Sequence, residues 1–392
     1  MAQAATIIIG GGIAGLWLCD ALRRRGDPVV LLERSGLGDG QTIRSQGIIH
    51  GGVKYALAGA LSESAANIGE MPARWMASLE GTAEPDLRTA RLRTRYCHLW
   101  QTEGLRPGLG MLGARLALQV TPEVLAAAER PPVLRECPGA VMRLAEPVVD
   151  VASVLGVLAA RNAGHLFLAD SIDFAPDAGG RVSAVQIRAG TKEPHRIVAS
   201  QVVIAAGQGA AALRSQLGLN PALMQRRPLH MVMVRGALPE LNGHCVDGGS
   251  TRATITTVVD AAGRMIWLVG GLIAEQGVGM TPAALLGHAR QELEAIVPGL
   301  SLRGTEWAAW RVDRAERSMP GGRRPDDVQL VVEGNVITAW PTKLALAPRL
   351  ADRLLEAIAF TPGDQPEVPS EWPRPAVALP PWETEAEWTS VP

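Results

Sequence analysis

Cysteine is scarce in this chain of 392 residues, and the four copies (residues 19, 97, 137 and 245) are scattered without a CxxC pair. That spacing argues against a disulfide framework and a zinc site, and it suits a reducing compartment. The formal net charge is -1, so neither positive nor negative charge is in excess. The composition therefore does not predict a nucleic-acid-binding surface. No run of about 18 uncharged apolar residues occurs, so no membrane-spanning helix is expected.

The apolar stretch Thr6–Leu22 lacks the features of a signal peptide. No Lys or Arg precedes it, four glycines interrupt it, and the basic cluster Arg23–Arg25 follows it instead. We therefore expect a cytoplasmic protein. Its hydrophobic fraction of 47% and charged fraction of 20% suit a compact enzyme, and its length suits two packed domains.

The N-terminus predicts a dinucleotide-binding unit of the Rossmann type. A strand (Thr6–Ile9), a glycine turn, a helix (Leu16–Arg25) and a strand (Val29–Leu32) follow one another within about 30 residues. The turn fits GxGxxG, in which the glycines allow the tight turn, the approach of a pyrophosphate and close helix packing. The expected cofactor contacts here are Gly10, Gly12, Ile13, Ala14, Gly15, Glu33 and Arg34, with Glu33 accepting hydrogen bonds from a ribose.

A second segment indicates that the cofactor is FAD and not NAD. Gln201–Gly207 is an apolar strand that ends in Ala-Ala-Gly, and it resembles the second dinucleotide motif of FAD enzymes. Small residues there let the backbone approach the cofactor closely. FAD is therefore the predicted cofactor, with Ala206 and Gly207 among its contacts.

The rest of the chain differs from the N-terminal unit in composition and in its predicted strands. Short β-rich stretches between Leu229 and Ile273 predict an antiparallel sheet, and Arg311 lies in a mixed-charge segment. From Thr361 onward, eight prolines and three tryptophans predict an extended tail without a core of its own. We expect this tail to contribute little to flavin binding and to bury its tryptophans against the body or a partner.

These motifs, together with the turn Trp340–Leu344, resemble the D-amino-acid oxidase superfamily of flavoenzymes. The segment Arg44–Tyr55 is similar to the flavin-contacting loop of L-2-hydroxyglutarate dehydrogenases and FAD-dependent glycerol-3-phosphate dehydrogenases. The resemblance adds flavin contacts from Arg44, Ser45, Gln46, Gly47, Thr342, Lys343 and Leu344. Ile43 and Arg44 stand where some relatives carry a flavin-linking histidine, so we expect non-covalent FAD.

The resemblance also implies an α/β fold in which a discontinuous FAD-binding domain carries an inserted α+β substrate domain built on an antiparallel sheet. The expected FAD-binding domain comprises residues 1–80, 148–220 and 320–360, and the substrate domain residues 81–147 and 221–319. Residues 361–392 form the Pro/Trp-rich tail, which is a possible contact for a protein partner or an oligomer.

Oxidation of an alcohol or amine needs a base and a group that holds the substrate. His50 is the predicted base, because its imidazole titrates near neutral pH and glycines follow it; a structural role, or the use of His230 or His244 instead, stays open. Lys54, Tyr55, Arg311 and Lys343 are the predicted substrate contacts, since cations hold a carboxylate or phosphate well. Solvated ion pairs around Arg311 are the alternative.

The predicted function is hydride transfer from a small anionic 2-hydroxy acid or polyol phosphate to FAD. Oxidation of an amino acid or amine is one alternative, and a flavin-carrying subunit of a larger assembly is another.

Overall fold

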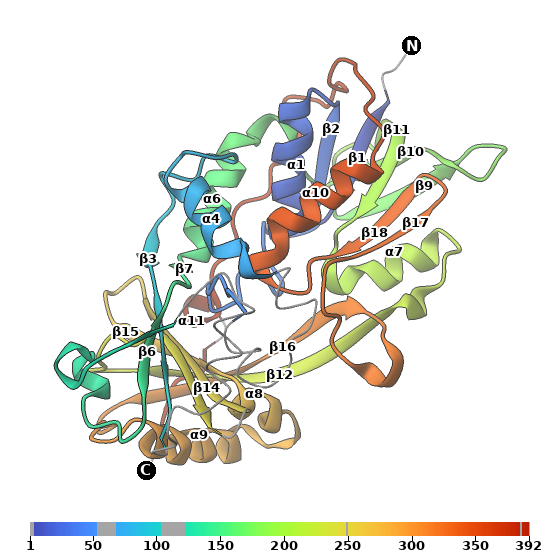
Figure 1. Ribbon diagram of the computed structural model, residues 1–392. Helices are drawn as coiled ribbons and strands as arrows, with labels where there is room; N and C mark the ends of the chain where they lie inside the picture. The colour runs from blue at the N-terminus through green and yellow to red at the C-terminus, as the bar shows by residue number, and fades with distance from the viewer. Residues whose placement is uncertain (1–3, 53–67, 103–121, 248–249, 385, 392) are drawn as a thin grey trace.

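The computed structural model describes residues 4–52, 68–102, 122–247, 250–384 and 386–391. It contains two large sheets (Figure 1). A third sheet has only two strands, Leu92–Thr94 (β3) and Val148–Val149 (β7). The described N-terminal residues lie beside the first large sheet. The C-terminus lies beside the second.

The first sheet has eight strands, with the order β17-β18-β11-β1-β2-β8 along its main path. The strands from β18 to β8 run parallel, so their carboxyl ends meet at one edge. Strands β9 and β10 extend the sheet from β11 in antiparallel fashion, and β17 pairs antiparallel with β18. The bounds are Ala5–Ile9 (β1), Val29–Glu33 (β2), Leu166–Leu168 (β8), Ser171–Pro176 (β9), Val182–Arg188 (β10), His195–Ile204 (β11), Gln329–Glu333 (β17) and Val336–Trp340 (β18).

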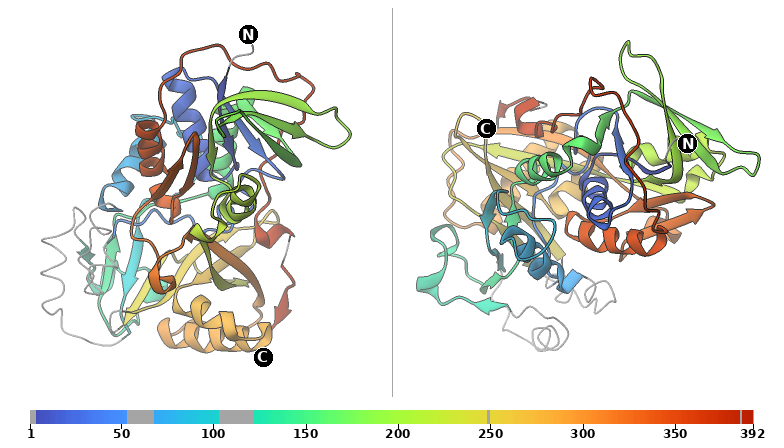
Figure 2. Two further views of the ribbon diagram at one scale, coloured as in Figure 1. Left: turned by 90° about the vertical axis from the view of Figure 1, so that its right-hand side faces the viewer. Right: turned by 90° about the horizontal axis from the view of Figure 1, so that it is seen from above.

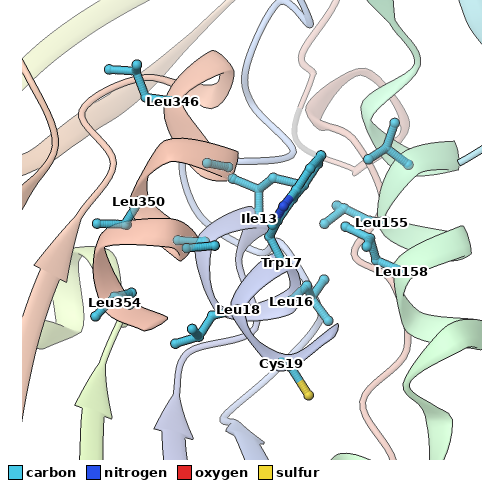
Figure 3. Close-up of a cluster of buried hydrophobic side chains, with 14 of the residues drawn as sticks. Ile13, Leu16, Trp17, Leu18, Cys19, Leu155, Leu158, Leu346, Leu350 and Leu354 are labelled. Carbon is cyan, nitrogen blue, oxygen red and sulfur yellow. The ribbon is translucent and has the colours of Figure 1, made fainter. Parts of the chain in front are cut away.

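Helices cover the first sheet and explain why α1 is apolar on most of its surface. Figure 3 shows α1 (Ile13–Arg25) between α10 (Ala347–Ala357), which contributes Leu350 and Leu354, and α6 (Val151–Arg161). Trp17 also packs on Trp75 of α4 (Met71–Leu79), with 4.8 Å between ring centroids, and both tryptophans are buried as core residues. Helix α1 ends at Gly26, whose φ of 90° provides the left-handed cap that stops a helix.

The second sheet has nine strands in the order β19-β16-β12-β15-β14-β13-β4-β6-β5. Its helices α8 (Leu272–Gln276) and α9 (Pro282–Ile296) lie at the opposite end of the molecule from α1 (Figure 1). The strand bounds are Cys97–Trp100 (β4), Glu123–Val124 (β5), Val141–Leu144 (β6), Met224–Arg235 (β12), Gly243–Asp247 (β13), Ser250–Val259 (β14), Met265–Gly270 (β15), Glu306–Arg317 (β16) and Thr389–Ser390 (β19). Helices α7 (Ala210–Gln216) and α11 (Pro381–Thr384) complete the described helices.

The mixed-charge segment around Arg311 is part of a long strand, and some of its charged residues form ion pairs. Strand β16 pairs with β12 over twelve residue positions. Two of its glutamates are paired across the strands, because Glu316 accepts two hydrogen bonds from Arg227 and Glu306 accepts two from Arg235. Cross-strand pairs of opposite charge stabilise an antiparallel ladder, so the charges support this strand.

The tail after Thr361 packs on the body, which is one of the two ways in which its tryptophans were expected to be buried. Figure 2 shows it, in dark red, running along one side of the molecule from the first sheet to the second. Trp372 is 3% exposed and donates to the carbonyl of Leu168, while Trp382 and Trp388 pack against the second sheet. The tail therefore contacts both large sheets and connects them.

Candidate active site

One cavity of about 880 Å³ lies along the carboxyl edge of the first sheet and extends to β12, β14 and β16 of the second. It brings together nearly all the described residues that the sequence predicted for the cofactor and the substrate. Its lining includes Gly10, Gly12, Ile13, Ala14, Glu33, Arg34, Arg44, Ser45, Gln46, Gly47, His50, Ala206, Gly207, Arg311, Thr342, Lys343 and Leu344. Ligands bind at this edge in open α/β sheets.

The glycine turn is packed too tightly for any other residue. A Cβ atom on Gly10 would lie 2.6 Å from the carbonyl oxygen of Ala205, and one on Gly15 would lie 2.0 Å from that of Gly10. Gly15 is absent from the cavity lining because its role is this close packing. The contact between Gly10 and Ala205 also joins the two motifs that the sequence separates by about 190 residues. The turn therefore leaves the N-terminus of α1 open to a pyrophosphate.

Glu33 lies at the end of β2 and lines the cavity, as its spacing from the glycine turn predicts. One carboxylate oxygen accepts from the backbone N–H of Gly11 at 2.6 Å, and the other accepts from Arg34 and Ser35. These bonds fix the carboxylate beside the turn. Oε2, which accepts only the bond from Gly11, keeps a further lone pair for a ribose hydroxyl.

Two buried polar atoms of uncharged side chains on the cavity wall have no hydrogen-bond partner among the described residues. They are the hydroxyl of Ser45 and the indole N–H of Trp340. A buried polar group without a partner is costly, so such atoms indicate a missing ligand. Together with the glycine cradle, they fit FAD, whose isoalloxazine and ribityl chain offer both donors and acceptors.

The loop between β2 and α4 holds three of the predicted cofactor contacts in different ways. Gln46 lines the cavity, but its amide N–H₂ donates to the carbonyls of Thr254 and Leu268 and so ties the loop to the second sheet. Gly47 adopts a φ of 77°, and a Cβ there would lie 2.3 Å from the carbonyl oxygen of Val149. Arg44 bonds Asp39 and the carbonyl of Gly40.

Thr342 is the one residue other than glycine with a positive φ among the described residues, at 60°. It directly follows β18 and precedes a turn of 3-10 helix (Leu344–Leu346) that leads into α10. A β-branched residue in this conformation is strained, and such strain is often found at functional sites. The backbone of Thr342–Leu344 is thereby directed along the cavity wall.

His50 contacts a buried glutamate that the sequence analysis missed. Its Nδ1 lies 3.4 Å from Oε2 of Glu146, and Nε2 of His244 lies 3.5 Å from the same oxygen. Glu146 and His244 are fully buried, whereas His50 lines the cavity. Among the described residues this is also the one group of three side chains whose donor atoms are close enough to hold a metal ion, and the sequence analysis expected none.

Cationic side chains line the same cavity. Arg311 and Lys343 were predicted, and the structure adds Arg314 and Arg324. Burial, reinforced by the nearby charges of Arg324 and Arg227, lowers the pKa of Arg314 to about 10, at which the guanidinium is still charged at neutral pH. The sequence signal for Arg311 and Arg314 was the mixed-charge run, and strand β16 places both of them at the cavity.

Other predicted residues lie elsewhere. Lys54 and Tyr55 fall outside the described residues. His230 is buried on β12, bonds the carbonyl of Gly277 and is not part of the cavity lining. Burial, with a smaller contribution from Arg311, lowers the pKa of His230, so it is neutral near pH 7. His244 does not reach the cavity directly, but contacts it through Glu146 and His50.

The fold and the cavity define a dinucleotide-binding flavoenzyme, and comparison with known proteins agrees. Residues 5–339 match the family described as DAO, FAD dependent oxidoreductase. The chain is 42% identical to "Probable FAD-dependent oxidoreductase PA4991" of Pseudomonas aeruginosa, over 96% of this chain and 97% of that protein. The crystal structure of the Pseudomonas aeruginosa protein superposes with a TM-score of 0.82 and 39% identity, covering 98% of this chain and 99% of that one.

More distant structures share the fold alone. Glycine oxidase from Geobacillus kaustophilus superposes with a TM-score of 0.64 at 18% identity, covering 92% of this chain and 97% of that chain. Glycerol-3-phosphate dehydrogenase from Bacillus halodurans, solved in complex with FAD, gives 0.60 at 17% identity, covering 91% and 64%.

The chain belongs to the DAO family of FAD-dependent oxidoreductases, as its motifs predicted. It is therefore a flavoprotein enzyme with FAD as its cofactor. Within the described ranges, no helix is both long and apolar enough to cross a membrane.

Proposed function

We propose that the protein oxidises a small anionic 2-hydroxy acid or polyol phosphate and passes a hydride to non-covalently bound FAD. The observation that carries this proposal is the joint lining of one cavity by a histidine and by several cations, Arg311, Arg314 and Lys343 among them. Bound FAD supplies the hydride acceptor; the side chains of this protein supply the base and the anion site.

His50 is the proposed base for the substrate hydroxyl. Loss of a hydride from the carbon requires loss of the hydroxyl proton, and a neutral imidazole near pH 7 accepts a proton readily. The similarity of the His50 loop to that of 2-hydroxy-acid and glycerol-phosphate enzymes favours a hydroxyl over an amine.

The cations are the proposed site for the carboxylate or phosphate. Arg311 reaches the cavity from β16 and its terminal N–H lies 3.5 Å from the carbonyl oxygen of Val278, which is too long for a strong bond. Lys343 reaches it from the turn after β18. Charge-assisted hydrogen bonds from such groups hold an anion and orient its neighbouring carbon.

Anaerobic reduction by a panel of substrates tests the proposal. Purified protein is mixed with hydroxy acids, polyol phosphates, amino acids, neutral polyols and neutral amines, and bleaching of the flavin absorbance is followed. We expect one of the anionic alcohols to bleach it fastest, and His50→Ala to slow that reaction by roughly 10²–10⁴-fold with an unchanged flavin spectrum. The proposal is wrong if neutral amines or uncharged polyols bleach the flavin as fast as any carboxylate or phosphate.

The same panel separates two other functions. Fast bleaching by amino acids alone would indicate an amino-acid oxidase or dehydrogenase. No bleaching by any compound would indicate a flavin-carrying subunit, although the packing of the tail on its own body removes one reason to expect a partner there.

A further inference from the structure

We propose that Glu146 and His244 are positioning residues for His50, so that a buried glutamate shared by two histidines sets the tautomer and the basicity of the imidazole in the cavity. The inference rests on the proposed function for the role of His50 as the base. It adds Glu146, to which no motif or family resemblance pointed, and it gives His244 a role other than that of the base.

Every oxygen of the Glu146 carboxylate has a donor. Oε1 accepts from the backbone N–H of Gly51 at 2.7 Å, and Oε2 faces Nδ1 of His50 at 3.4 Å and Nε2 of His244 at 3.5 Å. The last two distances exceed the roughly 2.9 Å of an optimal bond, as catalytic hydrogen bonds often do before a ligand binds. The carboxylate is fully buried, so it is available to these three groups and not to water.

The second histidine holds the carboxylate without adding a charge. Nδ1 of His244 lies 2.9 Å from the hydroxyl of Thr254. If that hydroxyl donates to Nδ1, the imidazole is neutral and carries its proton on Nε2, which is the nitrogen that faces Glu146. Thr254 thus fixes the tautomer of His244. Because His244 is neutral, it does not neutralise Glu146, and the negative charge of Glu146 acts on His50.

The backbone fixes the distance between His50 and Glu146. The residues before His50 run antiparallel to the residues after Glu146, because Ile49 donates to the carbonyl of Pro147 at 2.8 Å and Ile48 forms an antiparallel bridge with Val148. His50 therefore cannot move away from Glu146 without breaking these bonds. Such support from fixed backbone is what a precise catalytic geometry requires.

The tautomer of His50 follows from this arrangement. Nδ1 carries the proton that is directed at Glu146, so Nε2 is the nitrogen that takes a proton from the substrate hydroxyl. After that transfer the imidazolium is stabilised by the buried carboxylate, and the proton remains on Nε2 until it leaves to solvent. Glu146 itself stays ionised throughout.

The electrostatics agree with an ionised Glu146. Burial alone would raise the pKa of this carboxyl, but hydrogen bonds from His244 and His50 outweigh it and hold the pKa well below its usual range. The interaction acts equally in both directions. Protonated His50 stabilises the ionised form of Glu146, and ionised Glu146 stabilises the protonated form of His50 to the same extent. Glu146 therefore makes His50 a stronger base.

The test compares Glu146→Gln with the parent protein, both loaded with FAD. Two readouts are used: titration of the His50 ring by NMR, assigned with His50→Gln, and the pH dependence of kcat and KM with the best substrate of the panel. We expect Glu146→Gln to move the His50 midpoint and the acid limb of the kcat profile to lower pH. It should lower kcat by roughly 10²–10⁴-fold, with KM little changed.

Asp20→Asn is the matched control. Asp20 is also a fully buried carboxylate, but it bonds Arg24 and Arg161 and is not part of the cavity lining. Its replacement should lower stability and leave both pH readouts unchanged. If Glu146→Gln fails to bind FAD, Thr254→Val gives the second test, because it removes only the hydroxyl that fixes His244; a smaller shift in the same direction is expected.

The outcomes separate this inference from the proposed function. An unchanged His50 titration in both Glu146→Gln and Thr254→Val overturns the positioning role, whatever the substrate. One equivalent of tightly bound metal, measured by plasma mass spectrometry on the purified protein, also overturns it, because the metal would occupy these nitrogens. A shifted titration in a protein that no hydroxy compound reduces supports the positioning and refutes the proposed reaction.

Discussion

Arg311 and Arg314 lie three residues apart on β16, yet their surroundings differ. Arg311 is exposed, whereas Arg314 is partly buried, and no salt bridge or hydrogen bond joins its guanidinium to another described residue. A cation in a partly dry site attracts an anion more strongly than one in water, because its charge is less screened. The two arginines should therefore contribute unequally to anion binding.

Arg311→Ala is expected to raise KM for an anionic substrate by roughly 10- to 150-fold, the effect of losing one hydrogen bond to a charged group. The flavin spectrum should not change. Steady-state kinetics measure the effect, and Arg303→Ala is the control because Arg303 is exposed and lies outside the cavity lining. Equal KM values for Arg311→Ala and the parent would remove Arg311 from the substrate site.

At the scale of elements, the tail contacts the loop that follows β2. Leu37 donates to the carbonyl of Ala376 and accepts from the N–H of Ala378. Residues on both sides of Leu37, including Ser35 and Gly38, line the cavity. The tail therefore supports the expected adenosine end of the FAD site, which differs from the sequence-based expectation that it contributes little to flavin binding.

Truncation after Phe360 should weaken FAD binding, because the loop at Leu37 loses both backbone bonds and Trp372 leaves the core. Truncation after Leu379 keeps these contacts and removes only α11 and β19, so it should retain FAD. Fluorescence of released flavin on dilution measures the difference. Equal retention of FAD by both truncated proteins would show that the loop holds its conformation without the tail.

The sequence predicted those parts of the site that have a recognisable local pattern, and it did not predict those whose partners are distant in the sequence. The glycine turn, Glu33 and the strand into Gly207 have fixed spacings, and the structure brings them to one cavity. Strand β16 was missed because its alternating charges are satisfied by β12, which is distant in the sequence. Glu146 was missed for the same reason: its partners come from β13 and from the His50 loop, and no local pattern marks it.

For the molecule as a whole, we expect a yellow protein that releases its flavin on denaturation. Ile43 and Arg44 offer no side chain of the kind that links flavin covalently in some relatives, and the cavity lining described above can hold FAD by hydrogen bonds and packing. Acid precipitation followed by chromatography of the supernatant should recover FAD. Colour that stays with the precipitate would contradict non-covalent binding.

Acid should destabilise the protein through its buried carboxylates. Burial alone would raise the pKa of Asp20, but hydrogen bonds from Arg161 and Arg24 lower it below the usual value. A carboxyl with a lowered folded-state pKa stabilises the fold above its unfolded pKa of about 3.9, and this contribution is lost as the pH falls through the folded value. The free energy of unfolding should therefore fall below about pH 5.

Urea unfolding between pH 7 and pH 3 measures this dependence. Asp20→Asn should be less stable than the parent at pH 7 and should lose less stability on acidification, because the amide does not titrate. Parallel curves for the two proteins would place the acid sensitivity in other groups, such as Glu146 or Asp327, whose pKa values are also lowered.

The strand order of the first sheet has a consequence for synthesis on the ribosome. Strand β1 emerges first, but its neighbour β11 ends at Ile204 and the next strand, β18, ends at Trp340. The turn after β18, which forms part of the cavity wall, is therefore made only after most of the chain has been synthesised. A nascent chain stopped near residue 320 would leave the edge of β11 that pairs with β18 open, so we expect FAD to bind late, when translation is nearly complete.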